Sequence, residues 1–216
     1  MNLESILSFA NLIVSSVNVI LAFSLWAYIL THNWRNPVAR AFVALLAFVT
    51  VVHASDVVIF NVGEAEEKFR WLRFQWLGLA FIPAAYLHFS DALLRIAHSF
   101  SPLRKLMVWV GYGFGTAIFL LSALTDWVVQ DGVYLAWATH FKAGPLFWLY
   151  TLYFAGATLW GTANLVRARQ RTLTPASRRR LTYLTISLAA PVLGAFPYLL
   201  LANLPNYLPP TVFLAS

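Results

Sequence analysis

The chain alternates between long apolar stretches and short polar connections. The apolar stretches cover residues 5–30, 38–61, 71–96, 106–127, 146–166 and 181–203, and another begins at Thr211. A helix needs about 20 apolar residues to cross the ~30 Å hydrocarbon core of a bilayer. Backbone polar groups in lipid must be bonded within the chain, so stretches this long predict helices, whereas a membrane barrel shows ~10-residue alternating segments. The pattern predicts an all-α polytopic membrane bundle with six complete transmembrane helices and the start of a seventh.

The composition favours a membrane protein over a soluble one. Hydrophobic residues make up 60% of the chain and charged residues 11%, whereas about a quarter of a soluble domain is charged. No soluble domain or long linker interrupts the apolar pattern, so residues 1–216 are predicted to form a single transmembrane bundle. The sequence has no cysteine, which excludes disulfides, thiolate metal sites and cysteine nucleophiles.

Positive charges are divided unevenly between alternate connections. The first, third and fifth connections hold 11 of the 15 Lys and Arg residues, and the second and fourth hold the others together with five acids. Short loops rich in Lys and Arg stay in the cytoplasm, so the N-terminus is predicted to be outside. The apolar run after Glu4 has no basic segment before it and is too long for a cleaved signal peptide. The net charge of +7 is expected to meet anionic lipid headgroups at the cytoplasmic face, and nucleic acid is not an expected partner.

Two pairs of ionisable side chains lie at membrane depth. His53 and Asp56 are three residues apart on the second stretch, and His88 and Asp91 repeat this spacing on the third, so each pair shares a helix face. Ionisable groups inside a membrane are costly and are functional candidates. At a rise of 1.5 Å per residue the two histidines differ by about 14 Å in depth, so no shared metal site is predicted.

The outer pair gives the main site hypothesis. A short acidic connection returns the chain from Asp56 to Arg73, which predicts an Asp56–Arg73 ion pair with His53 beneath it. The pair has two interpretations, a structural tie between neighbouring helices or the lining of a small-molecule pocket. A pocket would lie in the outer half between the second, third and fifth helices, roofed by residues 128–145, where Asp131-Gly132 predicts a turn. The candidate ligand-binding residues are His53, Asp56, Arg73, Gln75 and Trp76.

The inner half of the third stretch carries a second polar stripe. His88, Asp91 and Arg95 follow one another at helical spacing, and they predict a structural tie or a relay, because Arg95 can extend toward the headgroups. Pro83, near the middle of the same stretch, predicts a kink.

Small residues at helical spacing predict close helix packing within one protomer or, alternatively, across a homodimer. They are Gly111 with Gly115, Ala157 with Gly161, and Ala190 with Gly194.

Signatures of catalysis are missing from the sequence. There is no HExxH, no GxSxG, no glycine-rich phosphate loop and no carboxylate cluster on one helix, so no catalytic residue, cofactor or enzymatic activity is predicted for this chain. No lysine lies inside the six apolar stretches, which excludes a retinal-type pigment.

Several short segments of the chain have a recognisable pattern. They are NPVARAF (36–42), RWLRFQWLG (70–78), FIP (81–83), YLHFSD (86–91), GVY (132–134) and AGPLF (143–147). With these segments the chain resembles the N-terminal seven-transmembrane sensor region of bacterial histidine kinases. The resemblance implies an input module in the bacterial inner membrane that responds to an unidentified small ligand or membrane stimulus. It also implies that the last helix leads to a cytoplasmic output domain, such as a histidine kinase or nucleotide cyclase.

The sequence ends at Ser216, six residues into the expected seventh helix, without a phosphoacceptor helix or ATP-binding domain. We therefore expect a truncated input region without kinase activity of its own. The alternative is a small transporter or channel component, which inverted repeats would favour.

Overall fold

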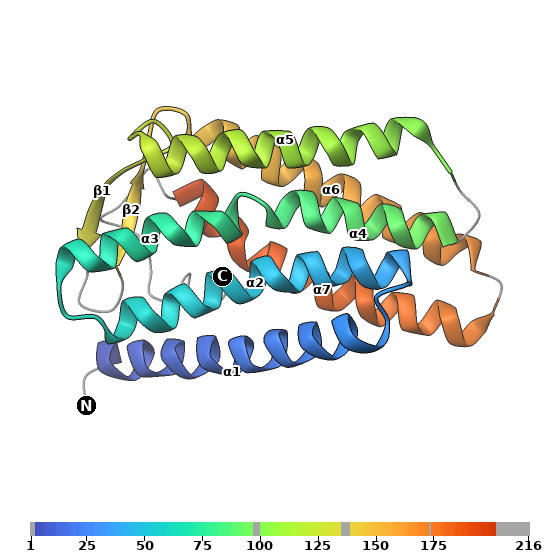
Figure 1. Ribbon diagram of the computed structural model, residues 1–216, viewed down its shortest axis with the longest axis horizontal. Helices are drawn as coiled ribbons and strands as arrows, with labels where there is room; N and C mark the ends of the chain where they lie inside the picture. Colours follow the sequence, from blue (N-terminus) through green and yellow to red (C-terminus); the bar gives the residue numbers. More distant parts are fainter. Residues whose placement is uncertain (1–2, 97–99, 135–138, 173, 202–216) are drawn as a thin grey trace.

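The computed structural model describes residues 3–96, 100–134, 139–172 and 174–201. Its helices run side by side in one bundle, with a small hairpin at one end (Figure 1). The structure is 84% helical, as expected for an all-α protein. The predicted seventh helix at Thr211 lies outside the described residues. The elements, in chain order, are α1 (Leu3–His32), α2 (Pro37–Asn61), α3 (Ala65–Leu79), α4 (Ile82–Ile96), α5 (Pro102–Leu124), β1 (Val129–Tyr134), β2 (Thr139–Ala143), α6 (Phe147–Arg171) and α7 (Pro175–Leu201).

The connections alternate between the two ends of the bundle, as the charge pattern predicts. The first, third and fifth connections lie at one end, which we call the arginine-rich end, and the hairpin lies at the other, which we call the hairpin end (Figure 1). Local signals set the helix starts at the arginine-rich end. The side chain of Asn36 accepts a hydrogen bond from the backbone N–H of Val38 at 2.9 Å, and Pro37 follows as the first residue of α2. The hydroxyl of Thr174 accepts a hydrogen bond from the backbone N–H of Ser177, and Pro175 is the first residue of α7. Both starts follow the expected pairing of a capping side chain with proline in the first turn.

Four helical stretches are long and apolar enough to cross a membrane. They are Ser8–His32, Pro37–Asn61, Ala65–Ile96 and Pro102–Leu124. Helices α6 and α7 have sufficient length, with 25 and 27 residues. However, α6 is richer in tyrosine, threonine and tryptophan, and α7 carries three consecutive arginines, Arg178–Arg180, within its first two turns. The chain is therefore a membrane protein region with several apolar helices.

The third apolar stretch forms two helices instead of one. α3 ends at Leu79, α4 begins at Ile82, and the turn between them precedes Pro83. Proline has no N–H to donate to the carbonyl four residues earlier, here Leu79, which accounts for a break at this position. The expected kink at Pro83 is thus confirmed as a break between α3 and α4, and the two helices together form one candidate span, Ala65–Ile96.

Most of α4 is buried, and glycines let its neighbours approach it closely. A Cβ on Gly115 of α5 would lie 2.7 Å from the Ala80 carbonyl oxygen, and one on Gly161 of α6 would lie 2.5 Å from the Tyr86 ring. Gly111 faces Ala84 less closely, since a Cβ there would lie 3.4 Å from the Ala84 Cβ, an ordinary contact distance. The small residues of α5 and α6 therefore pack within the protomer, and α4 is the central helix of the bundle.

The connection after α5 forms the predicted cap. β1 and β2 pair antiparallel, with a register shift between Gln130 and Gly132. Asp131-Gly132 therefore marks a bulge inside β1, not the predicted turn, and the Phe69 ring occupies the space where a Cβ of residue 132 would stand. Val129 and Phe141 are buried beneath the hairpin, so the hairpin closes that end of the bundle.

Protonation of His140 is expected to loosen this cap. His140 is buried in β2 and its Nδ1 donates to the Phe141 carbonyl at 3.0 Å. Burial lowers the pKa of His140, and the bond to the carbonyl offsets this only in part. The pKa of an exposed histidine is about 6.5, so below this pH the opened hairpin binds a proton at His140 that the closed hairpin does not bind. The contribution of His140 to the stability of the closed hairpin is therefore complete above about pH 6.5 and is lost as the pH falls toward the lowered pKa. The protection factors of the strand amides, which correct the measured exchange rates for their intrinsic pH dependence, should fall as the pH is lowered below about 6.5. His140→Gln should remove this pH dependence.

Candidate functional site

Polar side chains from α1, α2 and α3 meet inside the apolar part of the bundle. On α1, Ser15 and Ala22 are buried, and Asn18 lies on the same helical face between them. On α2, His53 lies about 12 Å from the end of the helix at Asn61. This face of α1 is small and polar, which lets α1 lie against the polar face of α2.

These side chains form a nearly continuous polar chain. Asn18 Nδ2 lies 3.4 Å from His53 Nε2. Gln75 of α3 donates through Nε2 to Asp56 Oδ1 at 2.5 Å and to the Val52 carbonyl at 3.2 Å. The chain thus joins α1 to α2 and α2 to α3 at a depth where an unpaired polar group is expensive.

The polar chain has one gap, between His53 and Asp56. His53 Nδ1 is 3.6 Å from Asp56 Oδ2, which is too long for a direct hydrogen bond. Among the described residues, this buried nitrogen has no other hydrogen-bond partner. Because His53 Nε2 faces the amide donor of Asn18, the ring proton belongs on Nδ1, pointing at the carboxylate. The Asp56 side chain is 33% exposed, so its carboxylate is not enclosed within the bundle.

Arg73 has a different partner from the predicted one. Its Nη2 lies 2.7 Å from Asp126 Oδ1, and its Nη1 donates to the carbonyl oxygens of Ser122 and Ala123. The expected Asp56–Arg73 ion pair is therefore wrong: Arg73 binds the end of α5, where the unpaired carbonyls of the last turn favour a cation. Arg73 belongs to the tie between α3 and α5, outside the polar chain.

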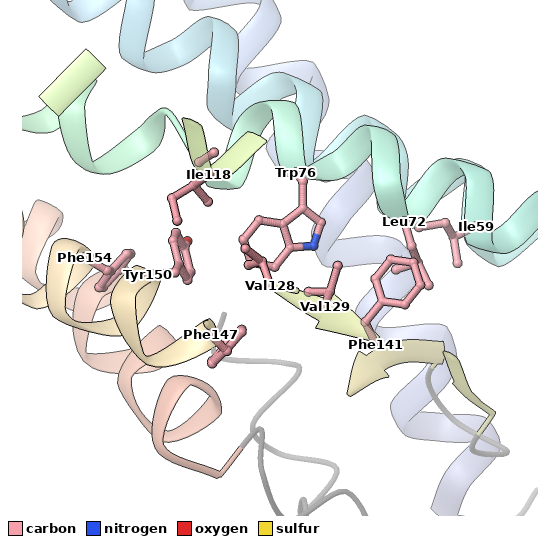
Figure 2. Close-up of a cluster of buried hydrophobic side chains, with 11 residues drawn as sticks. Ile59, Leu72, Trp76, Ile118, Val128, Val129, Phe141, Phe147, Tyr150 and Phe154 are labelled. Atoms are coloured by element: carbon pink, nitrogen blue, oxygen red, sulfur yellow. The ribbon is translucent and has the colours of Figure 1, made fainter. Parts of the chain in front are cut away.

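Trp76 lies in the core and does not line an open pocket. It is 3% exposed, and its ring meets Tyr150 edge-on with the centroids 4.9 Å apart. Figure 2 shows it among the side chains of α5, α6 and the hairpin, next to Val128. In the structure the ring packs α3 against α6 beneath the cap, and its role as an aromatic ligand contact stays a prediction. The cluster comprises Ile59, Leu72, Trp76, Ala80, Ile118, Val128, Val129, Phe141, Phe147, Tyr150 and Phe154.

A second charged cluster lies near the arginine-rich end. Asp91 is 1% exposed, and its two oxygens pair with Arg95 Nη2 at 2.6 Å and with Arg104 Nε at 2.9 Å. His88 Nδ1 is 3.2 Å from the hydroxyl of Tyr112 on α5. In the predicted stripe on α4, His88 and Asp91 thus have partners on α5, while Arg95 pairs with Asp91 within α4. Asp91 joins α4 to the first turn of α5.

Tyrosines of α6 bond to the carbonyls at the α3–α4 break. Tyr150 donates to Leu79 O at 3.1 Å, the carbonyl that Pro83 leaves without its helical donor. Tyr153 donates to Gly111 O at 3.1 Å and approaches Ala80 O at 3.4 Å. In the membrane these carbonyls need a donor, so α6 supplies from its side chains what the broken helix lacks.

Asn18, Arg104 and the two tyrosines did not emerge from the sequence as site residues. Asn18 could have been recognised as a candidate, because it is an amide within a highly apolar stretch and lies on the same helical face as Ser15, three residues earlier. Arg104 and the tyrosines had none, because arginine at a membrane boundary and tyrosine on a membrane helix are common. Among the described residues, no group of three His, Asp or Glu side chains is arranged to hold a metal ion.

The comparisons with known proteins agree with this architecture. Residues 12–216 match the family described as the N-terminal 7TM region of histidine kinase. No curated protein and no solved structure matches the chain. Since the match covers nearly the whole sequence, the chain belongs to the family of N-terminal seven-transmembrane regions of histidine kinases.

Proposed function

We propose that this chain is the input module of a bacterial signalling protein in the inner membrane, and that it has no enzymatic activity of its own. In this proposal it senses a stimulus at the hairpin end and passes a change in helix position to a cytoplasmic output domain. The gap between His53 Nδ1 and Asp56 is the observation that carries it. The buried N–H of His53 and the partly exposed carboxylate of Asp56 together favour a small polar ligand that forms hydrogen bonds to both groups.

The contacts of Gln75 suggest how such a ligand would change the packing of α2 and α3. Gln75 uses one nitrogen for both Asp56 and the Val52 carbonyl, so a ligand that competes for Asp56 weakens the contact between α2 and α3. α3 continues through the break into α4, which carries Asp91 at the other end. A ligand shifts this assembly only if it binds two arrangements with different affinity. The break is the element that lets α3 move without an equal movement of α4.

Removing the polar chain is expected to abolish the response. We would replace His53 and Gln75 by leucine in a protein that carries this chain with its output domain, and measure output against stimulus. Both side chains are apolar after substitution, so the membrane insertion and expression should persist while the competition for Asp56 is lost. Thr116→Leu is the matched control, because Thr116 is exposed and bonds only to its own helix. An unchanged dose response in the double variant would move the site elsewhere.

The proposed orientation has the N-terminus outside and the arginine-rich end in the cytoplasm, with six complete spans and a seventh leading to the output domain. The support is the 11-to-4 division of the 15 Lys and Arg residues, since positive short loops stay inside. Single cysteines are easily placed because the chain has none. A membrane-impermeant thiol reagent applied to intact cells should label position 64 and spare position 178. Labelling of position 178 from outside would reverse the orientation.

A transporter or channel component is the second candidate. The polar chain within the membrane is the observation that favours it, because buried polar side chains also line transport paths. Uptake or ion flux in liposomes that contain only this chain would favour the transporter, while a response that requires an attached output domain would favour the sensor.

A further inference from the structure

A groove of about 410 Å³ runs between α5 and α6, with α4 at its base. Leu87 of α4 forms the floor, Met107 and Phe114 stand on α5, and Leu152 and Trp160 stand on α6. The lining is almost wholly apolar, and it contains Gly156, where a Cβ would meet no atom within 4 Å. The hollow therefore exists because α6 has a glycine where a side chain would otherwise fill it.

The groove opens sideways from the bundle. Its rims are exposed, with Val110 54% and Leu152 62% accessible, and α5 is one of the helices long and apolar enough to cross a membrane. Its stretch of α6, residues 149–160, rises about 16 Å, roughly half of a ~30 Å hydrocarbon core. The groove thus has the depth of one leaflet and faces the acyl chains of that leaflet.

Two arginines lie beyond the groove on α6, toward the arginine-rich end. Arg167 lies seven residues after Trp160, and Arg171 eleven, so both lie on the helix face that forms the wall of the groove, with Arg167 about 10 Å beyond it. Both are exposed. An apolar groove that leads to exposed guanidinium groups matches a lipid with an acyl chain and an anionic headgroup.

We propose that this groove binds one acyl chain of an anionic phospholipid, whose headgroup meets Arg167. The bound chain contacts Tyr153, which lines the groove and bonds to Gly111 O while approaching Ala80 O at the α3–α4 break. Lipid in the groove therefore stabilises the arrangement in which α4, α5 and α6 meet at the break. This site is distinct from the polar chain on α1, α2 and α3, and it goes beyond the proposed function.

Photo-cross-linking in nanodiscs tests the proposal on this chain alone. The probe is phosphatidylglycerol with a diazirine on one acyl chain, and cross-linked residues are mapped by mass spectrometry. We expect cross-links at Met107 and Leu152 that fall at least about tenfold in Gly156→Leu, which fills the groove. Gly113→Leu is the matched control, because Gly113 also has open space around it but lies outside the groove. Leu152→Trp gives a second way to fill the groove if Gly156→Leu does not fold.

Separate measurements test the headgroup preference and the alternative occupants of the groove. Cross-linking should favour the phosphatidylglycerol probe over a phosphatidylcholine probe, and Arg167→Gln should remove this preference. Equal yields in wild type and Gly156→Leu, or equal yields at the exposed α1 residue Leu21, would show ordinary surrounding lipid and overturn the proposal. A disulfide between two copies through Cys introduced at position 156, in place of lipid cross-links, would assign the groove to a dimer. Since the experiment needs no output domain, the lipid site and the sensor function can fail independently.

Discussion

Replacing Asp91 by asparagine should destabilise the protein by about 3–5 kcal/mol, the largest effect we expect from a single substitution. Asp91 is 1% exposed and pairs with two arginines, and the Arg104 side chain is itself only 12% exposed. Asparagine has nearly the same shape but no charge, so Arg104 stays largely buried without its carboxylate. The free energy of unfolding in bicelles, measured with denaturant, would give the size of the loss.

Asp126→Asn is the matched control for this measurement. It removes the same charge from an arginine pair, but Asp126 is 69% exposed and Arg73 is 35% exposed, so the cost should be below about 1 kcal/mol. A second change, Arg104→Gln in the Asp91→Asn background, should recover part of the loss because both buried charges are then absent. Equal costs for the two aspartate variants would mean that water reaches Asp91 and that the cluster is not a tie between α4 and α5.

Replacing Gly78 by leucine should separate α2 from α3. A Cβ at Gly78 would lie 2.5 Å from Val52 Cγ2 and 2.6 Å from the Phe48 carbonyl oxygen, and the carbonyl belongs to the backbone of α2 and cannot rotate away. We expect a loss of about 1–3 kcal/mol in unfolding free energy. Gln75, three residues earlier on the same face, should lose its bonds to Asp56 and Val52 O, which removes the response as well.

Gly113→Leu again serves as control, since nothing lies within 4 Å of the Cβ position there. Spin labels on cysteines introduced into α2 and α3 would report the separation directly by their distance distribution. An unchanged distance, together with wild-type stability, would contradict the close contact at Gly78.

The pattern of apolar stretches was sufficient to predict most of the helices and the alternation of their connections, but it predicted one helix where the structure has α3 and α4. It was also sufficient to place His53, Asp56 and Gln75 at one depth, because depth follows from the position of a residue along its helix. The cap and a kink at Pro83 were also predictable, because both depend on local sequence, but the complete break between α3 and α4 was not predicted.

The partners across helices were not predictable, and Arg73 shows why. Arg73 and Gln75 are two residues apart, so their side chains point to nearly opposite sides of α3, and only one of them can face Asp56. Arg73 and Gln75 both lie at the same depth as Asp56, but the rotation of α3 about its axis determines which of the two side chains faces Asp56. That rotation is set by Gly78, which fits against α2, and by Trp76, which packs toward α6. Arg73 is then turned toward the end of α5.

The bonds from Tyr150 and Tyr153 to the break also determine when that break can be completed. α3 and α4 leave the ribosome well before α6, so at the time of their insertion the carbonyls at Leu79 and Ala80 have no tyrosine donor. We therefore expect the segment of α3 and α4 to stay unfinished until α6 has been synthesised. A nascent chain stalled before Tyr150 should carry a mobile third segment, and the release of residues 147–153 into the bilayer is the step that fixes its shape.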